Sequence, residues 1–418
     1  MERSSLYCYA KKSPYYFIMP KPRIIILMHY LELGGAEMAL LGLLGALDPT
    51  KVEVDLFVYS HQGPLMNFIP DHVNLLPEVG AYSVIERPMG EAVCRGHWGV
   101  AIGRLMAKWQ CWNYRRRHPA EGDDGAIMQY VGDSITPWLP NINPTVEYDL
   151  CISFLTPHNI GRDRVRARKR LAWIHTDYST VSVNAAKEQP VWGAYDAIAS
   201  ISDEVTRSFL KVFPSLESKI LAIENMLPEA YVMSRTDEFD AGREMTGSVK
   251  LLSIGRFCTA KNYDNVPDIA RRMIESGVGN LKWYIIGYGG DESLIRSKIT
   301  EARMADHVIL LGKKENPYPY IKACDIYVQP SRYEGKSVTV REAQILCKPI
   351  AVTAYPTAAS QIRDGIDGVI VPLDNEGCAD GLARFIADKA RQERIVAYLR
   401  THDYANVSEV EKIYNLLK

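Results

Sequence analysis

Short apolar runs alternate with helical or polar segments through the first half of the chain. The first run covers residues 23–28 (RIIILM), and the helix-like segment after it opens at Gly34 and Gly35. Such an alternation is typical of a parallel sheet with helices on both faces. The strands predicted in this half are 23–28, 52–60, 148–155, 170–177, 195–202 and 219–225.

The alternation stops at residues 236–248 and then starts again. This segment (TDEFDAGREMTGS) is rich in acids, glycines and small polar residues, which is typical of a domain boundary. We therefore predict an α/β protein with two Rossmann-like domains facing each other across a cleft, where ligands of open α/β sheets bind. The strands predicted in the second half are 249–257, 281–290, 307–312, 324–331, 349–354 and 368–372. The predicted parts are an N-terminal extension (1–22), a first domain (23–235), a linker (236–248), a second domain (249–400) and a C-terminal helix (401–418) that could pack across the junction.

Composition narrows the class of protein. The chain has 418 residues, with 49 Lys or Arg against 50 Asp or Glu, so no broad basic field predicts a nucleic-acid partner. No cysteines are spaced as CxxC, and Cys151 and Cys324 lie in apolar runs, which predicts reduced core thiols in a cytoplasmic protein. The histidines lack metal-binding spacing, so no metal is expected. No apolar run approaches the roughly 20 residues that span a bilayer. Residues 1–18 lack the apolar core of a signal peptide, and we expect synthesis to begin at Met19.

Three loops of the second half carry groups suited to an anionic ligand. Arg256 and Lys261 follow one predicted strand, Gly287 and Gly289 follow the next, and Glu334 precedes a predicted helix. Cations, glycines that allow close backbone approach and the amides of a helix start together form a cradle for a diphosphate. Glu334 would lie beside whatever the diphosphate carries.

A second acid, Glu342, follows eight residues after Glu334, inside the predicted helix. Two acids at this spacing across a loop-to-helix junction cannot share one helical face, so they reach different parts of an elongated ligand. A carboxylate accepts hydrogen bonds from two adjacent hydroxyls, which suits a sugar or a ribose.

The motifs together resemble one family. These are EGKSVTVRE (334–342), Gly255-Arg256, Lys261, Gly287-x-Gly289, GGAE (34–37) and WIHTD (173–177). In order and spacing, from about residue 23 to about residue 372, the chain is similar to glycosyltransferase family 4 of the polysaccharide-biosynthesis type. These are retaining enzymes of the GT-B fold, in which the first domain takes the acceptor and the second takes the nucleotide-sugar donor.

The resemblance implies a role for each matched residue. Glu334 would contact the donor sugar, Glu342 the ribose, and the base would lie near Leu311 to Lys313. Lys336 stands where the family often has Phe, and it could contact the diphosphate, contact an acidic donor or point into solvent. The predicted catalytic residues are Glu334, Arg256, Lys261 and His175. The predicted donor-binding residues are Gly34, Gly35, Gly287, Gly289, Leu311, Lys313, Gly335, Lys336, Ser337, Val338 and Glu342.

Several of these residues have a purely structural alternative. Glu334 could be an ordinary loop acid, and Arg256 and Lys261 could be surface cations. Glu342 could favour the helix dipole, His175 could be a satisfied core histidine, and Gly34 and Gly35 could only permit a tight turn. Asp177 could orient His175 or cap a following helix.

The resemblance implies a retaining transferase without metal or cofactor, which moves a sugar from a nucleotide-diphosphate sugar to a hydroxyl of a glycan or lipid-linked glycan in surface polysaccharide synthesis. One alternative is a GT-B sugar-nucleotide epimerase or hydrolase. The other is a non-catalytic sugar-nucleotide-binding subunit.

An amphipathic helix is predicted where apolar residues recur at alternating steps of four and three: Trp98, Ile102, Leu105, Trp109 and Trp112. We expect this stripe to pack against the first sheet; the alternative is a face that rests on a membrane, in a protein at the inner face of the cytoplasmic membrane. The arginines at 162, 164, 166, 168 and 170 would share one face if extended and scatter if helical. A lipid diphosphate acceptor or an anionic membrane would explain both clusters, and so would ordinary solvated surface.

Overall fold

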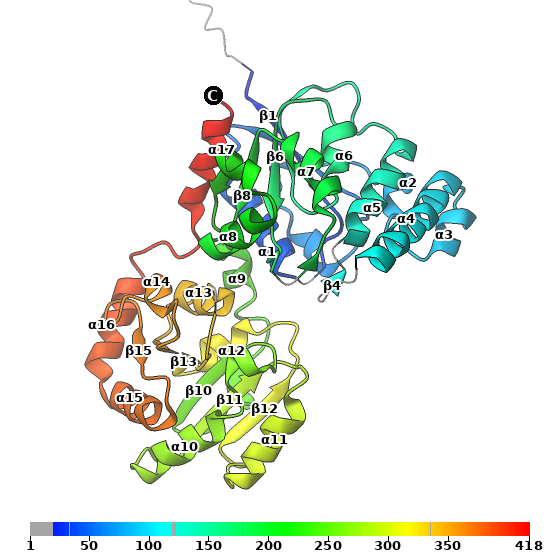
Figure 1. Cartoon of the computed structure of the whole chain (residues 1–418). Helices are drawn as coiled ribbons and strands as arrows, with labels where there is room; N and C mark the ends of the chain where they lie inside the picture. Colours follow the sequence, from blue (N-terminus) through cyan, green and yellow to red (C-terminus); the bar gives the residue numbers. More distant parts are fainter. Residues whose placement is uncertain (1–19, 33, 119–122, 125, 180, 335) are drawn as a thin grey trace, which may run out of the picture.

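The computed structural model describes residues 20–32, 34–118, 123–124, 126–179, 181–334 and 336–418. The predicted start at Met19, most of the N-terminal extension and the donor-binding assignment of Gly335 lie outside the described residues. Two lobes, each built on a parallel sheet, follow one another along the chain (Figure 1).

The first lobe contains a seven-stranded sheet in the order β3-β2-β1-β5-β6-β8-β9, in which all neighbours are parallel. On β1, Ile24 and Ile26 belong to one buried cluster, whereas Ile25 and Leu27 belong to another. Both faces are thus covered, which explains why the strands read as continuous apolar runs. The strands are β1 (Arg23–Met28), β2 (Glu53–Val58), β3 (Val73–Leu75), β5 (Tyr148–Ser153), β6 (Ala167–Ile174), β8 (Ala197–Ser200) and β9 (Ile220–Ala222).

The second lobe contains a six-stranded parallel sheet in the order β12-β11-β10-β13-β14-β15. All twelve strands predicted from the sequence are present in the two sheets, so the α/β prediction with two Rossmann-like domains is confirmed. The prediction missed β3 and the short pair β4 (Asp123–Asp124) and β7 (Val181–Ser182). The strands of this lobe are β10 (Val249–Ile254), β11 (Leu281–Ile286), β12 (Val308–Gly312), β13 (Ile326–Gln329), β14 (Ile350–Thr353) and β15 (Val369–Val371).

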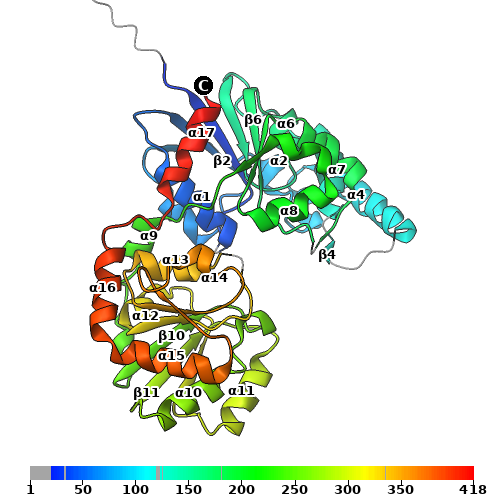
Figure 2. The ribbon, with the colours of Figure 1, turned by 60° about the vertical axis from the view of Figure 1, so that its left-hand side comes forward.

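Helices surround both sheets (Figures 1 and 2). In the described residues, none of them is long and apolar enough to cross a bilayer. The helices of the first lobe are α1 (Gly35–Ala46), α2 (Gly80–Ser83), α3 (Met89–Cys94), α4 (Trp98–Arg117), α5 (Ala126–Ile135), α6 (Asn159–Asp163), α7 (Ala185–Gly193), α8 (Asp203–Val212) and α9 (Glu229–Ser234). Those that follow are α10 (Val266–Glu275), α11 (Glu292–Glu301), α12 (Tyr318–Ala323), α13 (Val338–Ile345), α14 (Ala358–Gln361), α15 (Asn375–Ala387), α16 (Lys389–Leu399) and α17 (Val410–Leu416).

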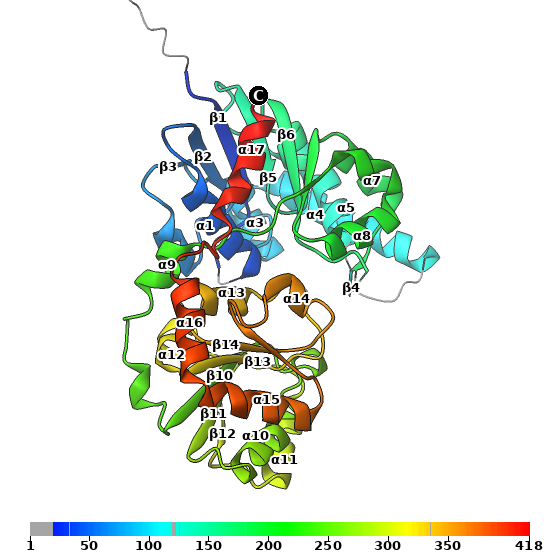
Figure 3. The ribbon, with the colours of Figure 1, turned by 90° about the vertical axis from the view of Figure 1, so that its left-hand side faces the viewer.

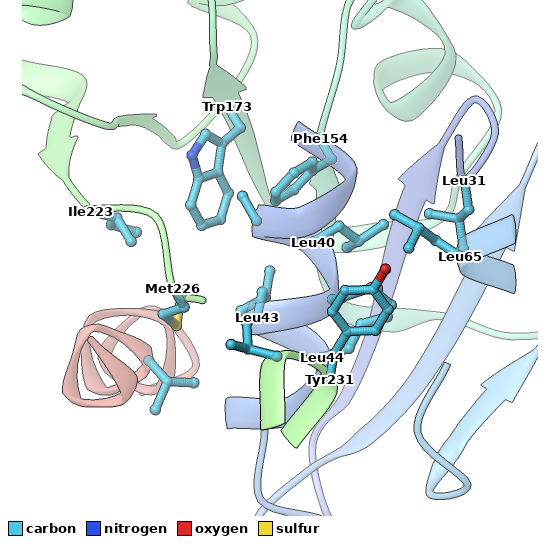
Figure 4. Close-up of a cluster of buried hydrophobic side chains, with 14 of the residues drawn as sticks. Leu31, Leu40, Leu43, Leu44, Leu65, Phe154, Trp173, Ile223, Met226 and Tyr231 are labelled. Atoms are coloured by element: carbon cyan, nitrogen blue, oxygen red, sulfur yellow. The ribbon is translucent and has the colours of Figure 1, made fainter. Parts of the chain in front are cut away.

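Helix α1 fills the space between the first sheet and the chain segment that leaves it. Figure 4 shows Leu40, Leu43 and Leu44 of α1 among Trp173, Met226 and other buried side chains. A Cβ on Gly42 would lie 2.1 Å from the Met226 carbonyl oxygen, so only glycine allows the helix to approach this segment so closely. Core packing therefore fixes the position of Met226, where the chain begins to cross toward the second lobe.

The chain crosses between the lobes twice. It first leaves β9 for β10, and after α16 it returns to place α17 beside the first lobe (Figure 3). The Asp48 amide donates to the Tyr414 hydroxyl at 2.7 Å, and Lys51 pairs with Glu411 at 2.9 Å. The two crossings also touch each other, because the Leu227 amide donates to the Ala405 carbonyl at 2.9 Å.

The apolar stripe of α4 does not pack against the first sheet, so that expectation is wrong. Trp98, Trp109 and Trp112 are 60%, 62% and 53% exposed. The face that packs is built from small residues, and a Cβ on Gly103 would lie 2.6 Å from the Ser134 carbonyl oxygen of α5. The close helix contact on the small-residue side turns the large apolar side chains outward.

The arginine series does not form one free cationic face. Arg162 bonds to its neighbour Asp163, Arg168 pairs with Asp149 at 3.0 Å, and Arg170 donates to backbone carbonyls of residues 161, 165 and 167. These side chains bond mainly to residues around β5 and β6, so the anionic partner suggested for them is not needed to explain them.

Candidate active site

Three predicted loops meet because their strands are neighbours. Strands β11, β10 and β13 are adjacent in the second sheet and parallel, so their carboxyl ends open at the same edge. The loops that leave them hold Gly287, Arg256 and Glu334, respectively. Figure 1 shows this edge of the sheet turned toward α13, α9 and the first lobe.

Glu334 is the centre of a dense hydrogen-bond network. One carboxylate oxygen, Oε1, accepts from Lys261 Nζ at 2.5 Å, from Gln329 Nε2 at 2.9 Å and from the Ser331 hydroxyl at 2.6 Å. The Thr357 hydroxyl donates to the Glu334 carbonyl at 2.7 Å. No donor from the described part of the chain reaches Oε2. The network thus fixes the carboxylate while leaving one oxygen available to a ligand.

Arg256 and Lys313 line one pocket beside this network. The Arg256 side chain is exposed, and among described residues no hydrogen bond or ion pair holds its guanidinium. Lys313 lies 5.4 Å from the centre of the Tyr288 ring. Leu311 is instead partly buried against the core. The pocket is lined by Ile254, Gly255, Arg256, Ile286, Gly287, Tyr288, Lys313, Lys314 and Glu315.

The glycines at this edge have a packing role. A Cβ on Gly287 would lie 1.9 Å from the Gly255 carbonyl oxygen, and one on Gly289 would lie 2.4 Å from that of Phe257. The Gly287 amide donates to the Gly312 carbonyl at 3.0 Å, so it is not available to a phosphate. The glycines allow the loops after β10 and β11 to lie directly against each other, which brings Arg256 to the pocket.

Lys336 points across the cleft rather than into solvent. It pairs with Glu224 of the crossing segment, and Glu224 also holds Arg341 of α13 at 3.2 Å. Lys336 and Arg341, the two cationic partners of Glu224, lie more than a hundred positions from it in the chain, so the sequence pattern could not reveal these pairs. An interdomain pocket surrounds this pair, lined by Asp177, Ile201, Ser202, Glu204, Val205, Glu224, Asn225, Leu227, Lys336, Ser337, Val338, Arg341 and Asn406.

The start of α13 has one amide already in use. The Ser337 amide donates to Gln361 Oε1 at 2.9 Å, and Gln361 donates back to the Ser337 carbonyl at 2.7 Å. Val338, the first residue of the helix, is 39% exposed. First-turn amides have no partner inside a helix, so an anion at this end would meet Val338 and its successors.

Glu342 is buried within the second lobe. Its Oε1 accepts from the Tyr318 hydroxyl at 2.9 Å. Burial raises the pKa of Glu342 to about 7, and the Tyr318 bond partly opposes this rise. The side chain lines neither of the two pockets described above. A favourable interaction with the helix dipole does not explain this buried position, because an exposed carboxylate would interact with the dipole without losing its hydration.

His175 follows β6 and rests on aromatic rings. Its ring stacks on Trp173 at 5.9 Å and contacts Phe154 at 4.6 Å. Burial lowers the pKa of His175 to about 3, so the imidazole is neutral at physiological pH. No described residue bonds to its enclosed Nε2. The unsatisfied ring nitrogen argues against a satisfied core histidine.

Asp177 accepts from the Ser179 amide at 2.9 Å and so stabilises its own turn. That Asp177 orients His175 stays a prediction. No helix begins within the next few described residues, so it does not cap one as suggested.

Gly34 and Gly35 lie at the N-terminus of α1, as the sequence predicted. Gly34 is the residue before the helix, and its carbonyl accepts from the Met38 amide at 3.0 Å. A Cβ on Gly35 would meet no atom within 4 Å, so packing does not demand glycine there. The buried Glu37 of the same turn has its pKa raised by burial.

The first lobe contains a polar pair that the sequence did not predict. His29, directly after β1, bonds through Nδ1 to Glu86, and no described residue bonds to its Nε2. Histidine after an apolar strand was the available signal, but Glu86 lies 57 positions away. The pocket around this pair is lined by His29, Tyr30, Ile85, Glu86, Arg104, Lys108, Ile127, Met128, Val131, Leu155 and Thr156.

Comparison with known families identifies the second lobe. The family model described as "Glycosyl transferases group 1" matches residues 234–402, about two fifths of the chain. The second lobe is therefore a glycosyltransferase domain.

Curated relatives match over short stretches. One is the N-acetylgalactosamine-N,N'-diacetylbacillosaminyl-diphospho-undecaprenol 4-alpha-N-acetylgalactosaminyltransferase of Campylobacter jejuni, 28% identical over 140 residues, which are 33% of this chain and 37% of the relative. Another is the lipopolysaccharide core biosynthesis mannosyltransferase LpsB of Rhizobium meliloti, 27% identical over 103 residues, 24% of this chain and 29% of LpsB. The chain spans about a third of the length of the curated relatives it matches.

Among solved structures, a mutant of S. aureus TarM in complex with fondaparinux, alpha-GlcNAc-glycerol and UDP superposes with a TM-score of 0.62. The identity is 12%, and the match covers 95% of this chain and 100% of that one. At this identity the likeness concerns the fold alone, and it confirms the GT-B architecture.

Proposed function

We propose that this protein is a retaining, metal-independent glycosyltransferase of family 4 that moves a sugar from a nucleotide-diphosphate donor to a hydroxyl of a lipid-linked glycan. The observation that carries the proposal is the fixed Glu334–Lys261 pair beside the unpaired Arg256, at the edge of a glycosyltransferase domain. The reaction would serve the synthesis of a surface polysaccharide at the inner face of the cytoplasmic membrane.

The charges of the edge fit a diphosphate leaving group. Arg256 and Lys261 would neutralise the two phosphates, and the first-turn amides of α13 from Val338 onward would add donors. The nucleoside would occupy the pocket lined by Tyr288 and Lys313. The UDP in the TarM structure supports a uridine nucleotide as the first donor to test.

The mechanism follows from where charge develops. As the bond from the anomeric carbon to the diphosphate oxygen breaks, negative charge grows on the leaving group, where Arg256 and Lys261 stabilise it. Glu334 accepts hydrogen bonds from sugar hydroxyls through its unoccupied Oε2. The acceptor hydroxyl attacks from the leaving-group side, and a diphosphate oxygen takes its proton, so the anomeric configuration is retained.

His175 contributes as a neutral hydrogen-bonding group. A protonated imidazole would repel the oxocarbenium-like sugar, whereas the neutral ring can bond a sugar hydroxyl through Nε2. Its position on Trp173 and Phe154 holds the ring in one orientation.

A lipid-linked acceptor is supported by the diphospho-undecaprenol in the name of the Campylobacter relative. The pocket around His29 and Glu86 lies at the carboxyl ends of β1 and β5, the edge of the first sheet that faces the cleft. This pocket is suited to acceptor hydroxyls.

A thermal-shift panel tests the donor. The native chain, Arg256→Ala and the matched control Arg296→Ala, an exposed arginine of α11, are compared with UDP-, GDP-, ADP- and TDP-sugars in the presence of EDTA. A donor at about 100 times its Kd stabilises the native state by about 2.7 kcal/mol. We expect one donor to shift the native chain and the control but not Arg256→Ala. No shift with any donor, or an equal shift with Arg256→Ala, would contradict the proposed site.

Product analysis tests the reaction. Nuclear magnetic resonance of the product identifies its anomeric configuration, and inversion would refute the retaining mechanism. Turnover of the donor without acceptor would instead favour an epimerase or hydrolase.

A further inference from the structure

The outer face of α4 is an apolar surface without a protein partner in the described chain. The residues recur along one line of the helix, and we call this surface the tryptophan face: Trp98, Ile102, Leu105, Met106, Trp109 and Trp112, all between 47% and 62% exposed. Monomeric proteins rarely expose large contiguous apolar patches unless these bind something. Helix α4 lies at the edge of the first lobe, on the side opposite α17 (Figures 1 and 2).

The helix is held rigidly from behind. Arg104 donates to the carbonyls of Val84 and Arg87, which ties α4 to the segment before α3. A Cβ on Gly99 would lie 2.5 Å from the Trp138 ring, so Trp138 packs directly over the first turn. Trp138 is itself 56% exposed and extends the apolar surface. The outward position of the large side chains is therefore a consequence of firm packing on the other side.

The charge of α4 indicates the chemistry of the partner. Between Trp98 and Arg117 the helix contains five cations and no acid. Arg115, Arg116 and Arg117 end the helix in exposed positions, and the Arg116 guanidinium lies 4.6 Å from the Trp112 ring centre. A second copy of this chain docked through α4 would bring cations toward cations, which disfavours a symmetric dimer.

An anionic lipid surface matches both the exposed apolar side chains and the positive charge of α4. Tryptophan prefers the interface between headgroups and acyl chains, because its ring is apolar and its N–H is polar. Cations beside an apolar helix face attract anionic headgroups. We propose that the tryptophan face docks on an anionic membrane, with α4 lying in the plane of the interface.

This docking would deepen the proposed function. Arg104 and Lys108 of α4 also line the pocket that contains His29 and Glu86. One side of α4 would thus contact the bilayer while its flank borders the proposed acceptor pocket. A lipid-linked acceptor could then reach the cleft without leaving the membrane interface. This step rests on the proposed function, whereas the membrane docking of α4 does not depend on it.

Vesicle flotation tests the proposal. The full chain is mixed with phosphatidylcholine vesicles and with vesicles that also contain phosphatidylglycerol, at low and at high salt. We expect flotation with the anionic vesicles at low salt and its loss at high salt. The double variant Trp109→Ser/Trp112→Ser should bind about tenfold more weakly or worse. The matched control Leu294→Ser, which alters an exposed apolar residue of α11, should bind like the native chain.

Three results would overturn the proposal. They are absence of flotation, equal flotation of the double variant, and a native dimer that the double variant converts to monomer without any vesicle binding. Thermal unfolding of both variants checks that they fold. Because flotation needs neither donor nor turnover, its failure is distinct from failure of the proposed transferase, which the donor panel reports.

Discussion

The buried carboxyl of Glu342 predicts a specific change of stability with pH. Its pKa is raised from 4.5 to about 7 because the carboxylate is removed from water and has only the Tyr318 hydroxyl as partner. Between these two values the folded state holds a proton that the unfolded state has released. Stability contributed by the neutral form is therefore fully present below pH 4.5 and is lost as the pH rises through 7.

The size of the effect follows from the same values. At about 1.4 kcal/mol per pKa unit, the rise corresponds to about 3 kcal/mol of destabilisation in the ionised form. Glu342→Gln keeps the shape and an acceptor for Tyr318 but cannot ionise. We expect the variant to exceed the native chain in stability by only about 1 kcal/mol at pH 5 and by about 3 kcal/mol at pH 8.

Calorimetric unfolding from pH 5 to 8 measures this difference. A domain of this size changes its Tm by about 2–4 °C per kcal/mol, so the gap at pH 8 should be about 6–12 °C. Glu376→Gln, at an exposed position of α15, serves as the control and should follow the native chain. Parallel curves for Glu342→Gln and the native chain would refute the reasoning, since they would mean that Glu342 titrates alike when folded and unfolded.

Three further predictions follow from the site. Gly287→Ala should lower the free energy of unfolding by about 2 kcal/mol or more, because its Cβ would meet the Gly255 carbonyl oxygen at 1.9 Å; an unchanged Tm would contradict this. Because the pKa of His175 is near 3, this residue should not titrate between pH 5 and 8. The pH profiles of kcat/KM for the native enzyme and for His175→Asn should therefore have the same shape in this range, although the variant should turn over more slowly. A step near pH 6.5 that is present in the native enzyme and absent from the variant would show a titrating histidine instead. A double-mutant cycle of Glu224→Ala and Lys336→Ala should give a coupling of about 0.2–1 kcal/mol in unfolding experiments, since both side chains are a third exposed; a coupling of zero would mean that the ion pair does not hold the lobes in solution.

The strands were predictable because both sheets are parallel and buried on both faces. Runs such as 23–28 and 281–286 must then be apolar throughout, which leaves an unmistakable pattern. The edge strand β3, with Asn74 in its centre, lacks this pattern because only Val73 is fully buried. Loop residues just after the predicted strands, including Arg256 and Glu334, were found because the strand ends themselves are well marked.

Contacts between distant segments were not predictable. The sequence around Lys336 does not predict its pairing with Glu224, and the sequence around His29 does not predict its bond to Glu86. In both pairs the partners are distant in the chain and meet only in the folded structure. The tryptophan face was misassigned for a related reason. Periodicity reveals that α4 has an apolar stripe and a small-residue side, but not that the small residues determine which side packs.

The two chain crossings together act as a double-stranded hinge. They are fastened to each other by the Leu227–Ala405 backbone bond, and Asn406 of the second crossing donates to Glu224 of the first at 3.3 Å. Two connections that run side by side can bend together in one direction, whereas twisting one lobe against the other about their common axis would lengthen the path of both. Opening and closing of the cleft is therefore the soft motion of this architecture. Glu224 of the first crossing also pairs with Lys336 and Arg341 beside the start of α13. An anion that binds at the start of α13 would therefore compete with Glu224 for these two cations.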